Sequence, residues 1–279
     1  MNYRHGYHAG NFADVVKHVA LVVILQHLRK KDGAFSVIDT HAGRGLYDLR
    51  DAAPIATGEA EGGIARLADL AAKDAPPALG AYLRLVNECG RQRYPGSPLI
   101  AANLLRPQDR LTAIEKHPEE AAILKEVLAP FRGAVAQEAD GYARLVRLLP
   151  PPSRRGLILI DPPFEATGEF EILARTLATA IRKFATGIFL VWYPIKSQSA
   201  ADAFIGELLA AGIAKALTVE IAVAPPSERL TRAGVLVVNP PYGFAAEMLA
   251  TAALLAPRLA LDPARNPATI DVNWRAGSE

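Results

Sequence analysis

Gly156-Leu157-Ile158-Leu159-Ile160-Asp161-Pro162-Pro163-Phe164 is the stretch of sequence that decides the fold. Its short, continuous apolar run is typical of a strand that is buried on both faces of a parallel sheet. The two prolines cannot continue a hydrogen-bond ladder, so the strand is predicted to end at Asp161. Open α/β sheets keep their chemistry at the carboxyl ends of parallel strands. Asp161 is therefore predicted to lie at the functional edge of an α/β sheet.

The turn after this strand combines groups that suit the recognition of a planar amine. The carboxylate of Asp161 and the backbone carbonyl of Pro162 can accept two N–H groups, and the prolines stiffen the backbone. The ring of Phe164 offers a flat face on which a base can stack. Because an Asp-Pro turn is also an ordinary way to leave a strand, the functional interpretation depends on the other strand ends.

Composition bounds the class of protein. The chain has 279 residues, of which 51% are hydrophobic and 22% charged, and this predicts one large α/β domain or one domain with an insertion. A net charge of +2 does not by itself indicate a nucleic-acid partner, although basic residues cluster locally, as at Arg91 and Arg93. With a single cysteine, Cys89, no disulfide or cysteine-based metal site is expected.

No targeting, membrane or metal-binding segment is predicted. The N-terminus lacks the pattern of a signal peptide, and no apolar run is long enough to span a bilayer, so we expect a cytoplasmic protein. His5 and His8 have no third ligand at a suitable spacing, so a metal site is not expected.

The remaining elements are read from apolar patterns and from turn residues. Strands are predicted at 34–39, 110–115, 134–139, 187–192, 217–224 and 234–239. Helices are predicted at about 11–29, after 118, and at 142–149, 169–184, 198–211 and 244–260. The last two strands are predicted to form a hairpin, which makes the final strand antiparallel, and the tail after Leu261 is predicted to be mostly irregular.

The gap between the first two strands is too long for a simple βαβ unit. We therefore predict a main domain of residues 1–46 and 96–279, with a small helical insertion at 47–95. Just after the insertion, Ser97 is predicted to cap a helix that has Pro98 at its first position.

Three further strand ends carry polar or glycine-rich groups. Residues 40–45 form a glycine-bearing turn, which lets a ligand approach the backbone but lacks the third glycine of a dinucleotide fingerprint. Glu115 is placed to accept hydrogen bonds from ribose hydroxyls. Asp140 is placed to hold an adenine amino group or to cap the following helix. Together with Asp161, these ends predict one cleft for an adenosine cofactor and a substrate amine.

A second turn of similar composition, Asn239-Pro240-Pro241-Tyr242, competes for the role of amine binder. It follows the strand that is predicted to be antiparallel, so its end is expected at the opposite edge of the sheet. We therefore interpret it as a structural turn.

These motifs resemble those of class I S-adenosylmethionine-dependent adenine-N6 methyltransferases. Over nearly the whole chain the sequence is also similar to the RlmJ family of bacterial 23S rRNA methyltransferases. The stretches that carry this resemblance are YRHGYHAGNFADVVKH (3–18), DTHAGRG (39–45), YPGSPLI (94–100), EKHP (115–118), ADGY (139–142), SRRGLILIDPPFE (153–165) and LVWYP (190–194).

The resemblance implies a Rossmann-like, mostly parallel sheet, S-adenosylmethionine as cofactor and 23S rRNA as substrate. It implies that the cofactor is contacted by His18, His41, Ser97, Glu115, Asp140, Gly141 and Asp161. Asp161 would be the catalytic acceptor of the amine proton. Tyr3 would meet the RNA, with His5 and Lys17 as companions. Phe164 stands where related enzymes often have tyrosine, which removes one hydroxyl but keeps the ring.

Several readings stay open at this point. The same chemistry could act on DNA, and the chain could be an RNA-binding protein whose methyltransferase fold has lost activity. A nicotinamide-dependent oxidoreductase is disfavoured by the glycine spacing. If the substrate is RNA, it can be naked 23S rRNA or an early assembly particle, and a monomer is expected.

Overall fold

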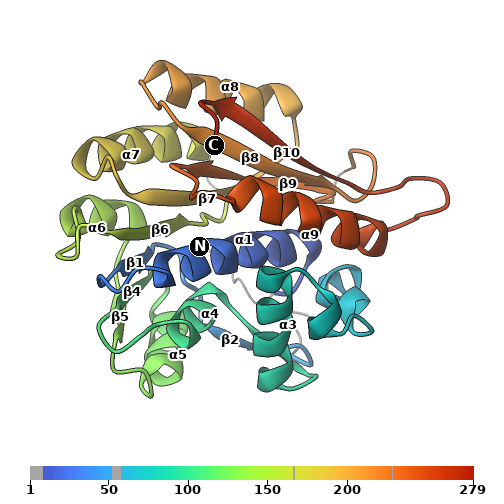
Figure 1. Cartoon of the computed structure of the whole chain (residues 1–279), viewed down its shortest axis with the longest axis horizontal. Coiled ribbons are helices and arrows are strands. Elements are labelled where there is room, and N and C mark those ends of the chain that lie inside the picture. Colours follow the sequence, from blue (N-terminus) through green and yellow to red (C-terminus); the bar gives the residue numbers. More distant parts are fainter. Residues whose placement is uncertain (1–8, 52–57, 166, 228) are drawn as a thin grey trace.

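A computed structural model describes residues 9–51, 58–165, 167–227 and 229–279. Within these ranges one large sheet has the strand order β10-β8-β9-β7-β6-β1-β4-β5 (Figure 1). Its strands are β1 (Ser36–Asp39), β4 (Arg110–Glu115), β5 (Ala134–Glu138), β6 (Gly156–Ile160), β7 (Ile188–Pro194), β8 (Ala216–Ala222), β9 (Arg232–Val238) and β10 (Thr269–Ala276).

The sheet confirms the predicted α/β fold with a Rossmann-like, mostly parallel sheet. Strands β5, β4, β1, β6 and β7 pair in parallel, and β6 is fully buried, as its apolar run predicted. The predicted hairpin is also present: β9 pairs antiparallel with β8 and lies between it and β7. Because β9 is antiparallel to both neighbours, β8 runs in the same direction as β7. The loop between β8 and β9 therefore lies at the carboxyl edge of the parallel strands.

The prediction of a mostly irregular tail after Leu261 missed one strand. Residues 269–276 form β10, which pairs antiparallel with β8 at the edge of the sheet. The strand has apolar Ile270, Val272 and Trp274 at alternate positions, the period-2 pattern of a half-buried strand. The prolines that precede this segment lie outside the strand, so they do not interrupt its ladder.

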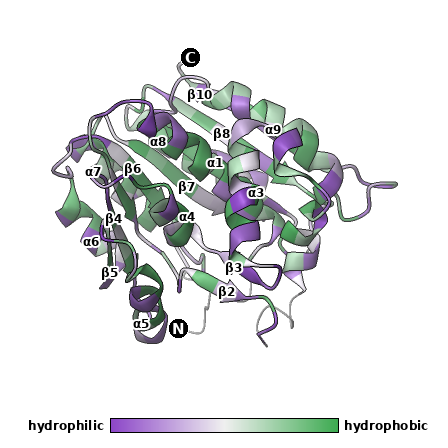
Figure 2. Cartoon of the chain, turned by 60° about the horizontal axis from the view of Figure 1, so that its bottom comes forward, coloured by the Kyte–Doolittle hydropathy of each residue, from purple (hydrophilic) through white to green (hydrophobic). Residues whose placement is uncertain are grey.

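Helices cover both faces of the sheet and create two apolar cores. One face carries α1 (Phe12–Arg29), α3 (Pro77–Cys89), α4 (Ser97–Asn103), α5 (Pro118–Leu128) and α9 (Phe244–Leu259), and the other carries α6 (Gly141–Leu148), α7 (Glu169–Lys183) and α8 (Gln198–Ala210). Along β6, Leu157 and Leu159 enter the first core, and Ile158 and Ile160 enter the second. Figure 2 shows the resulting hydrophobic interior strands between helices with mixed outer surfaces.

Helix α1 is buried on almost every side. It contacts β6, β7 and β9 on one side and α3, α4 and α9 on the others (Figure 1). A helix that is apolar all round needs such complete cover. Asn11 caps its start by accepting a hydrogen bond from the Asp14 amide at 2.8 Å.

In its described residues, the segment between β1 and β4 holds β2 (Leu46–Asp48), β3 (Arg93–Pro95), helices α3 and α4, and three short 3₁₀ helices. The latter are η2 (Glu59–Gly62), η3 (Ile64–Leu67) and η4 (Ala72–Asp74). The described part of the predicted helical insertion therefore combines an α-helix with short 3₁₀ turns. Tyr82 of α3 is buried in the same core as α1. That residues 47–95 form a subdomain of their own stays a prediction.

In the described part of the chain, no helix combines the length and the apolar character that crossing a bilayer requires.

Candidate functional site

A cleft of about 1050 Å³ opens at the carboxyl edge of the parallel strands. The start of α1, the turn after β1, the turn after β6, the end of β7 and the β8–β9 loop all contribute to its walls. The predicted site residues that line it are Lys17, His18, His41, Ser97, Asp161 and Phe164. The structure therefore brings together groups that are far apart in the sequence, such as Lys17 and Asp161, which are separated by 144 positions.

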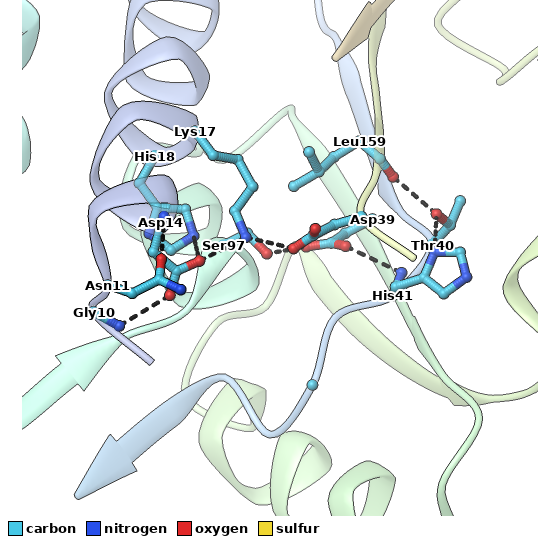
Figure 3. A network of polar contacts seen from close by, with 12 residues as sticks. Gly10, Asn11, Asp14, Lys17, His18, Asp39, Thr40, His41, Ser97 and Leu159 are labelled. Carbon is cyan, nitrogen blue, oxygen red and sulfur yellow. Dashed lines mark hydrogen bonds and ion pairs between the residues drawn. The ribbon is translucent and has the colours of Figure 1, made fainter. Parts of the chain in front are cut away.

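Asp161 forms a buried ion pair with Lys17. The Lys17 Nζ donates to Oδ2 of Asp161 and, at 2.7 Å, to Oδ1 of Asp14, and Lys17 and Asp161 are only 5% and 6% exposed. Burial alone would lower the pKa of Lys17, but the two carboxylates outweigh it, so the pKa lies above its usual value. The site thus holds a cation beside Asp161, the predicted acceptor of the amine proton. Figure 3 shows Lys17 extending from α1 toward the end of β1.

Asp14 anchors this cation, and the sequence interpretation did not identify it. Its carboxylate also accepts the Gly10 amide at 2.9 Å and lies 4.0 Å from Nε2 of His18. Burial raises the pKa of Asp14, but the charges of Lys17 and His18 and the hydrogen bonds from Lys17 and Gly10 bring it down to about 2. The i, i+3 spacing of Asp14 and Lys17 on an otherwise apolar helix was the signal that could have revealed the pair.

Ser97 does not cap α4, which corrects the sequence interpretation. Gly96 is the N-cap residue, Ser97 is the first helical residue, and the Ser97 hydroxyl donates to Oδ2 of Asp39 at 2.6 Å (Figure 3). Asp39 is fully buried, and burial together with the nearby charge of Asp161 raises its pKa to about 7. Asp39 was missed, although an acid at a strand end is the signal that singled out Glu115.

Glu115 forms a hydrogen bond with the glycine turn that follows β1. Its carboxylate accepts the Gly43 amide at 2.9 Å and the His117 amide at 2.7 Å, and only 8% of the residue is exposed. Gly43 and Gly45 both have positive φ values, 59° and 82°, which glycine adopts without a steric penalty. Glu115 is not among the residues that line the cleft, so it lies at the neighbouring strand end, behind the turn.

Asp140 is a helix cap, as one of its two readings predicted. It accepts the Ala143 amide at 3.1 Å and pairs with Lys116 at 2.8 Å. Gly141 follows it at the start of α6 and packs so closely on β1 that a Cβ atom would lie 2.0 Å from the carbonyl oxygen of Thr40. The glycine thereby brings the start of α6 against the turn that follows β1.

The two predicted histidines lie on different walls of the cleft. Nδ1 of His41 is 2.8 Å from Oγ1 of Thr40, and the ring packs edge-on against Tyr142 with centroids 5.0 Å apart. Nδ1 of His18 is 2.7 Å from the hydroxyl of Tyr94, and His18 is 1% exposed. Both rings are therefore held in place by hydroxyl groups.

Phe164 stands in an aromatic group at the end of the proline turn. Its backbone is left-handed (φ 51°), and its ring makes edge contacts with Phe170 at 4.8 Å and Trp192 at 5.7 Å. Pro163 lines the cleft beside it, whereas Pro162 is buried and does not line it. The turn thus places one ring and one carboxylate on the same wall.

The competing turn after β9 lies at the opposite edge of the sheet, as its antiparallel strand predicted. The Asn239 side chain donates to the backbone carbonyls of Ala185 and Gly187, both at 2.8 Å, beside the start of β7. Tyr242 is 80% exposed. Asn239 thus ties two loops together and faces no large cleft.

Some predictions fall elsewhere. Tyr3 and His5 lie outside the described residues. Arg91 and Arg93 are exposed but do not line the cleft. Among the described residues no group of three or more histidine, cysteine, aspartate or glutamate side chains is arranged to hold a metal ion.

Comparison with known proteins gives consistent matches. The family model described as ribosomal RNA large subunit methyltransferase D, RlmJ, matches residues 32–275. The ribosomal RNA large subunit methyltransferase J of Escherichia coli K12 is 42% identical over 254 residues, which are 89% of this chain and 90% of that protein. The protein of the same name from Haemophilus influenzae is 37% identical, with the same coverage. The crystal structure of a Legionella pneumophila protein superimposes with a TM-score of 0.87 at 33% identity and covers 98% of this chain and 99% of its own.

Proposed function

The chain belongs to the RlmJ family of ribosomal RNA large subunit methyltransferases, and from this premise we propose that it methylates the N6 amino group of an adenine in 23S rRNA. The observation that carries the proposal is the buried Asp161 at the carboxyl end of β6, which shares one cleft with the glycine turn after β1. S-adenosylmethionine is the proposed cofactor, and the reaction would take place in the cytoplasm.

The residues around the glycine turn fit this cofactor. The turn after β1 reaches the cleft through His41 and Ala42, and the carboxylates of Asp39, Glu115 and Asp140 stand at three strand ends. Carboxylates suit the hydroxyl, amino and cationic groups of such a molecule. We propose contacts from His18, His41, Ser97, Glu115, Asp140, Gly141 and Asp161. When bound, the cofactor supplies an electrophilic methyl group on a sulfonium ion.

Asp161 acts on the target amine. The adenine amino group is a weak nucleophile because its lone pair is delocalised into the ring. Lys17 occupies Oδ2 of Asp161, whereas Oδ1 receives no hydrogen bond from the residues that the structure describes. We propose that Oδ1 would accept one N–H group of the amine, that the carbonyl of the buried Pro162 would accept the other, and that both would orient the lone pair for methyl transfer. Once methylated, the nitrogen is acidic, and its proton passes to Asp161.

The ring of Phe164 supports a base as the substrate. The target base must leave its stack to reach a buried carboxylate, and Phe164 offers it an aromatic face inside the cleft. Tyr3 and His5, with Lys17, are proposed to meet the RNA. Naked 23S rRNA and an early assembly particle both fit this reading.

Transfer of labelled methyl from S-adenosylmethionine tests the proposal. Protein-free 23S rRNA and DNA of similar length are compared as substrates, with Asp161→Ala as the control variant. We expect label in the rRNA as N6-methyladenine and none with the variant, because Asp161 holds the amine. Near-normal activity of Asp161→Ala would refute its role, and label in DNA alone would replace RNA by DNA as the substrate. Cofactor binding without any transfer would favour a binding protein.

A further inference from the structure

We propose that the outer end of the cleft is a phosphate-binding subsite, in which Lys196 and Arg229 hold the RNA backbone beside the target adenosine. The inference rests on the proposed function, because it takes a flipped base at Asp161 as its reference point. It assigns a role to two residues that no motif singled out.

The strand order fixes where this subsite lies. The turn after β1 is one strand away from Asp161 on one side, and β7 is one strand away on the other. Lys196 follows β7, and Arg229 belongs to the loop that leads into β9, the next strand along. The proposed cofactor contacts and the two cations thus lie on opposite sides of Asp161.

The cleft is large enough for more than one ligand. Pockets for one small molecule usually occupy about 300 to 1,000 Å³, and this cleft of about 1050 Å³ continues past Phe164 and Trp192 to Lys196 and Arg229. A cofactor at the glycine turn therefore leaves room for a nucleotide at the other end.

Side-chain and backbone contacts connect the subsite to the catalytic turn. The ring of Phe164 packs edge-on against Trp192 of β7, with centroids 5.7 Å apart. Just beyond β7, the Ile195 amide donates to the Arg232 carbonyl at 3.0 Å, and the Arg232 guanidinium donates to the Gln198 side chain. Lys196 is therefore held between two residues that are both tied to the start of β9.

The loop that carries Arg229 is closed at its base. The Val223 amide donates to the Thr231 carbonyl at 2.9 Å, and the Thr231 hydroxyl donates to the Pro225 carbonyl at 3.1 Å. The side chain of Arg229 thus extends from a loop whose two ends are fixed beside Lys196.

The two cations differ from the other basic residues of the cleft. Lys17 is ion-paired with two carboxylates, and the guanidinium of Arg66 donates to the Ala260 carbonyl at 2.6 Å. Lys196 and Arg229 are exposed, and within the described ranges neither has a carboxylate partner. Their charge is available for an anion.

A phosphodiester is the anion that the place favours. Lysine and arginine are the usual partners of phosphate oxygens, and a base that is stacked near Phe164 carries its own phosphates out toward the mouth of the cleft. Glu59 and Glu61, which also line the cleft, belong to a different segment, η2. Their carboxylates would repel the RNA phosphates, which favours a path of the RNA backbone past Lys196 and Arg229.

The salt dependence of RNA binding tests the subsite. A double variant, Lys196→Gln with Arg229→Gln, removes two charges and keeps both side chains polar. Affinity for a 23S rRNA fragment is measured by filter binding, without S-adenosylmethionine, over a series of salt concentrations. The slope of log affinity against log salt is negative, and each lost single-strand phosphate contact reduces its magnitude by about 0.7. The double variant should therefore reduce the magnitude of the slope by about 1.4.

A matched variant and a second assay keep the result decisive. Lys30→Gln with Lys31→Gln makes the same charge change on exposed residues at the end of α1, and its slope should equal that of the unmodified protein. An unchanged slope in the Lys196/Arg229 variant, or an equal fall in both variants, would overturn the subsite. Because binding is measured without methyl transfer, failure of the proposed function shows separately, as absence of label in RNA with the unmodified protein.

Discussion

Two turns of this protein have nearly the same composition but lie at opposite edges of the sheet, in different surroundings. Asp161-Pro-Pro-Phe follows β6, and Asn239-Pro-Pro-Tyr follows β9; each leaves a buried strand, and each contains a residue with a left-handed backbone, Phe164 (φ 51°) or Asn239 (φ 53°). The first faces a cleft of about 1050 Å³, whereas the hollow beside the second holds about 230 Å³.

The difference lies in the direction of the strand, not in the turn. A parallel strand delivers Asp161 to the edge where β1 and β7 also end, so Lys17 and Phe164 meet it there. An antiparallel strand delivers Asn239 to the starting edge of β7, where its amide binds two backbone carbonyls. A D/N-P-P-aromatic motif therefore indicates chemistry only when its strand direction is known.

The largest expected effect comes from exchanging the two polar residues. Asp161→Asn removes the acceptor of the amine proton, and kcat should fall by about 10² to 10⁴-fold. Asn239→Asp should leave kcat unchanged, because the second turn is at the other edge of the sheet. Single-turnover methyl transfer measures both. Recovery of activity in the double exchange variant would contradict the comparison.

A smaller effect concerns the pH dependence of stability, through Asp39 at the edge of the sheet where Asp161 lies. The pKa of Asp39 is raised to about 7 by burial and by the charge of Asp161, so the folded protein keeps a proton that the unfolded chain releases above about pH 4. Asp39 therefore favours the fold at low pH, and its contribution to stability falls as pH rises from about 4 to 7.

Asp39→Asn should flatten this dependence by at most about 1.4 kcal/mol per pH unit. Urea unfolding at several pH values measures it, with Asp32→Asn, an exposed aspartate, as the matched control. A slope that persists unchanged in Asp39→Asn would show that another group titrates.

The smallest effect belongs to the structural turn. Asn239→Ala leaves two carbonyls without their donor and should cost about 1 to 3 kcal/mol of unfolding free energy, with kcat unchanged. Tyr242→Ala, at a ring that is 80% exposed, should change stability by less than about 0.5 kcal/mol. Denaturant titration compares the two variants. A loss of activity in Asn239→Ala would mean that the second turn communicates with the cleft.

Local signals predicted the strands well, because buried runs and turn residues act over short distances. The run before Asp161, the hairpin that includes β9 and the placing of the second turn all followed from such signals. Strand β10 was missed because the nearby prolines outweighed the alternation of Ile270, Val272 and Trp274.

The polar contacts of the site were harder to predict, since they join distant segments. Lys17 and Asp161 are 144 residues apart, and no sequence pattern shows that the lysine points at the acid. Ser97 followed the rule for a cap, but the fold places Asp39 within reach of its hydroxyl, and that hydrogen bond took precedence. The strand ends predicted where the polar site residues lie. The packing of α1 determined which of them form ion pairs.

The position of α1 also has a consequence for biosynthesis. This first helix is apolar on nearly every side, yet part of its cover comes from β9 and α9, which begin at Arg232 and Phe244. At about 5 to 20 residues per second, a ribosome needs on the order of 10 to 40 seconds to make the intervening chain. During that time the helix that carries Lys17 and Asp14 has an open apolar flank, which makes the nascent chain a client for chaperones and delays the assembly of the active site until synthesis is nearly complete.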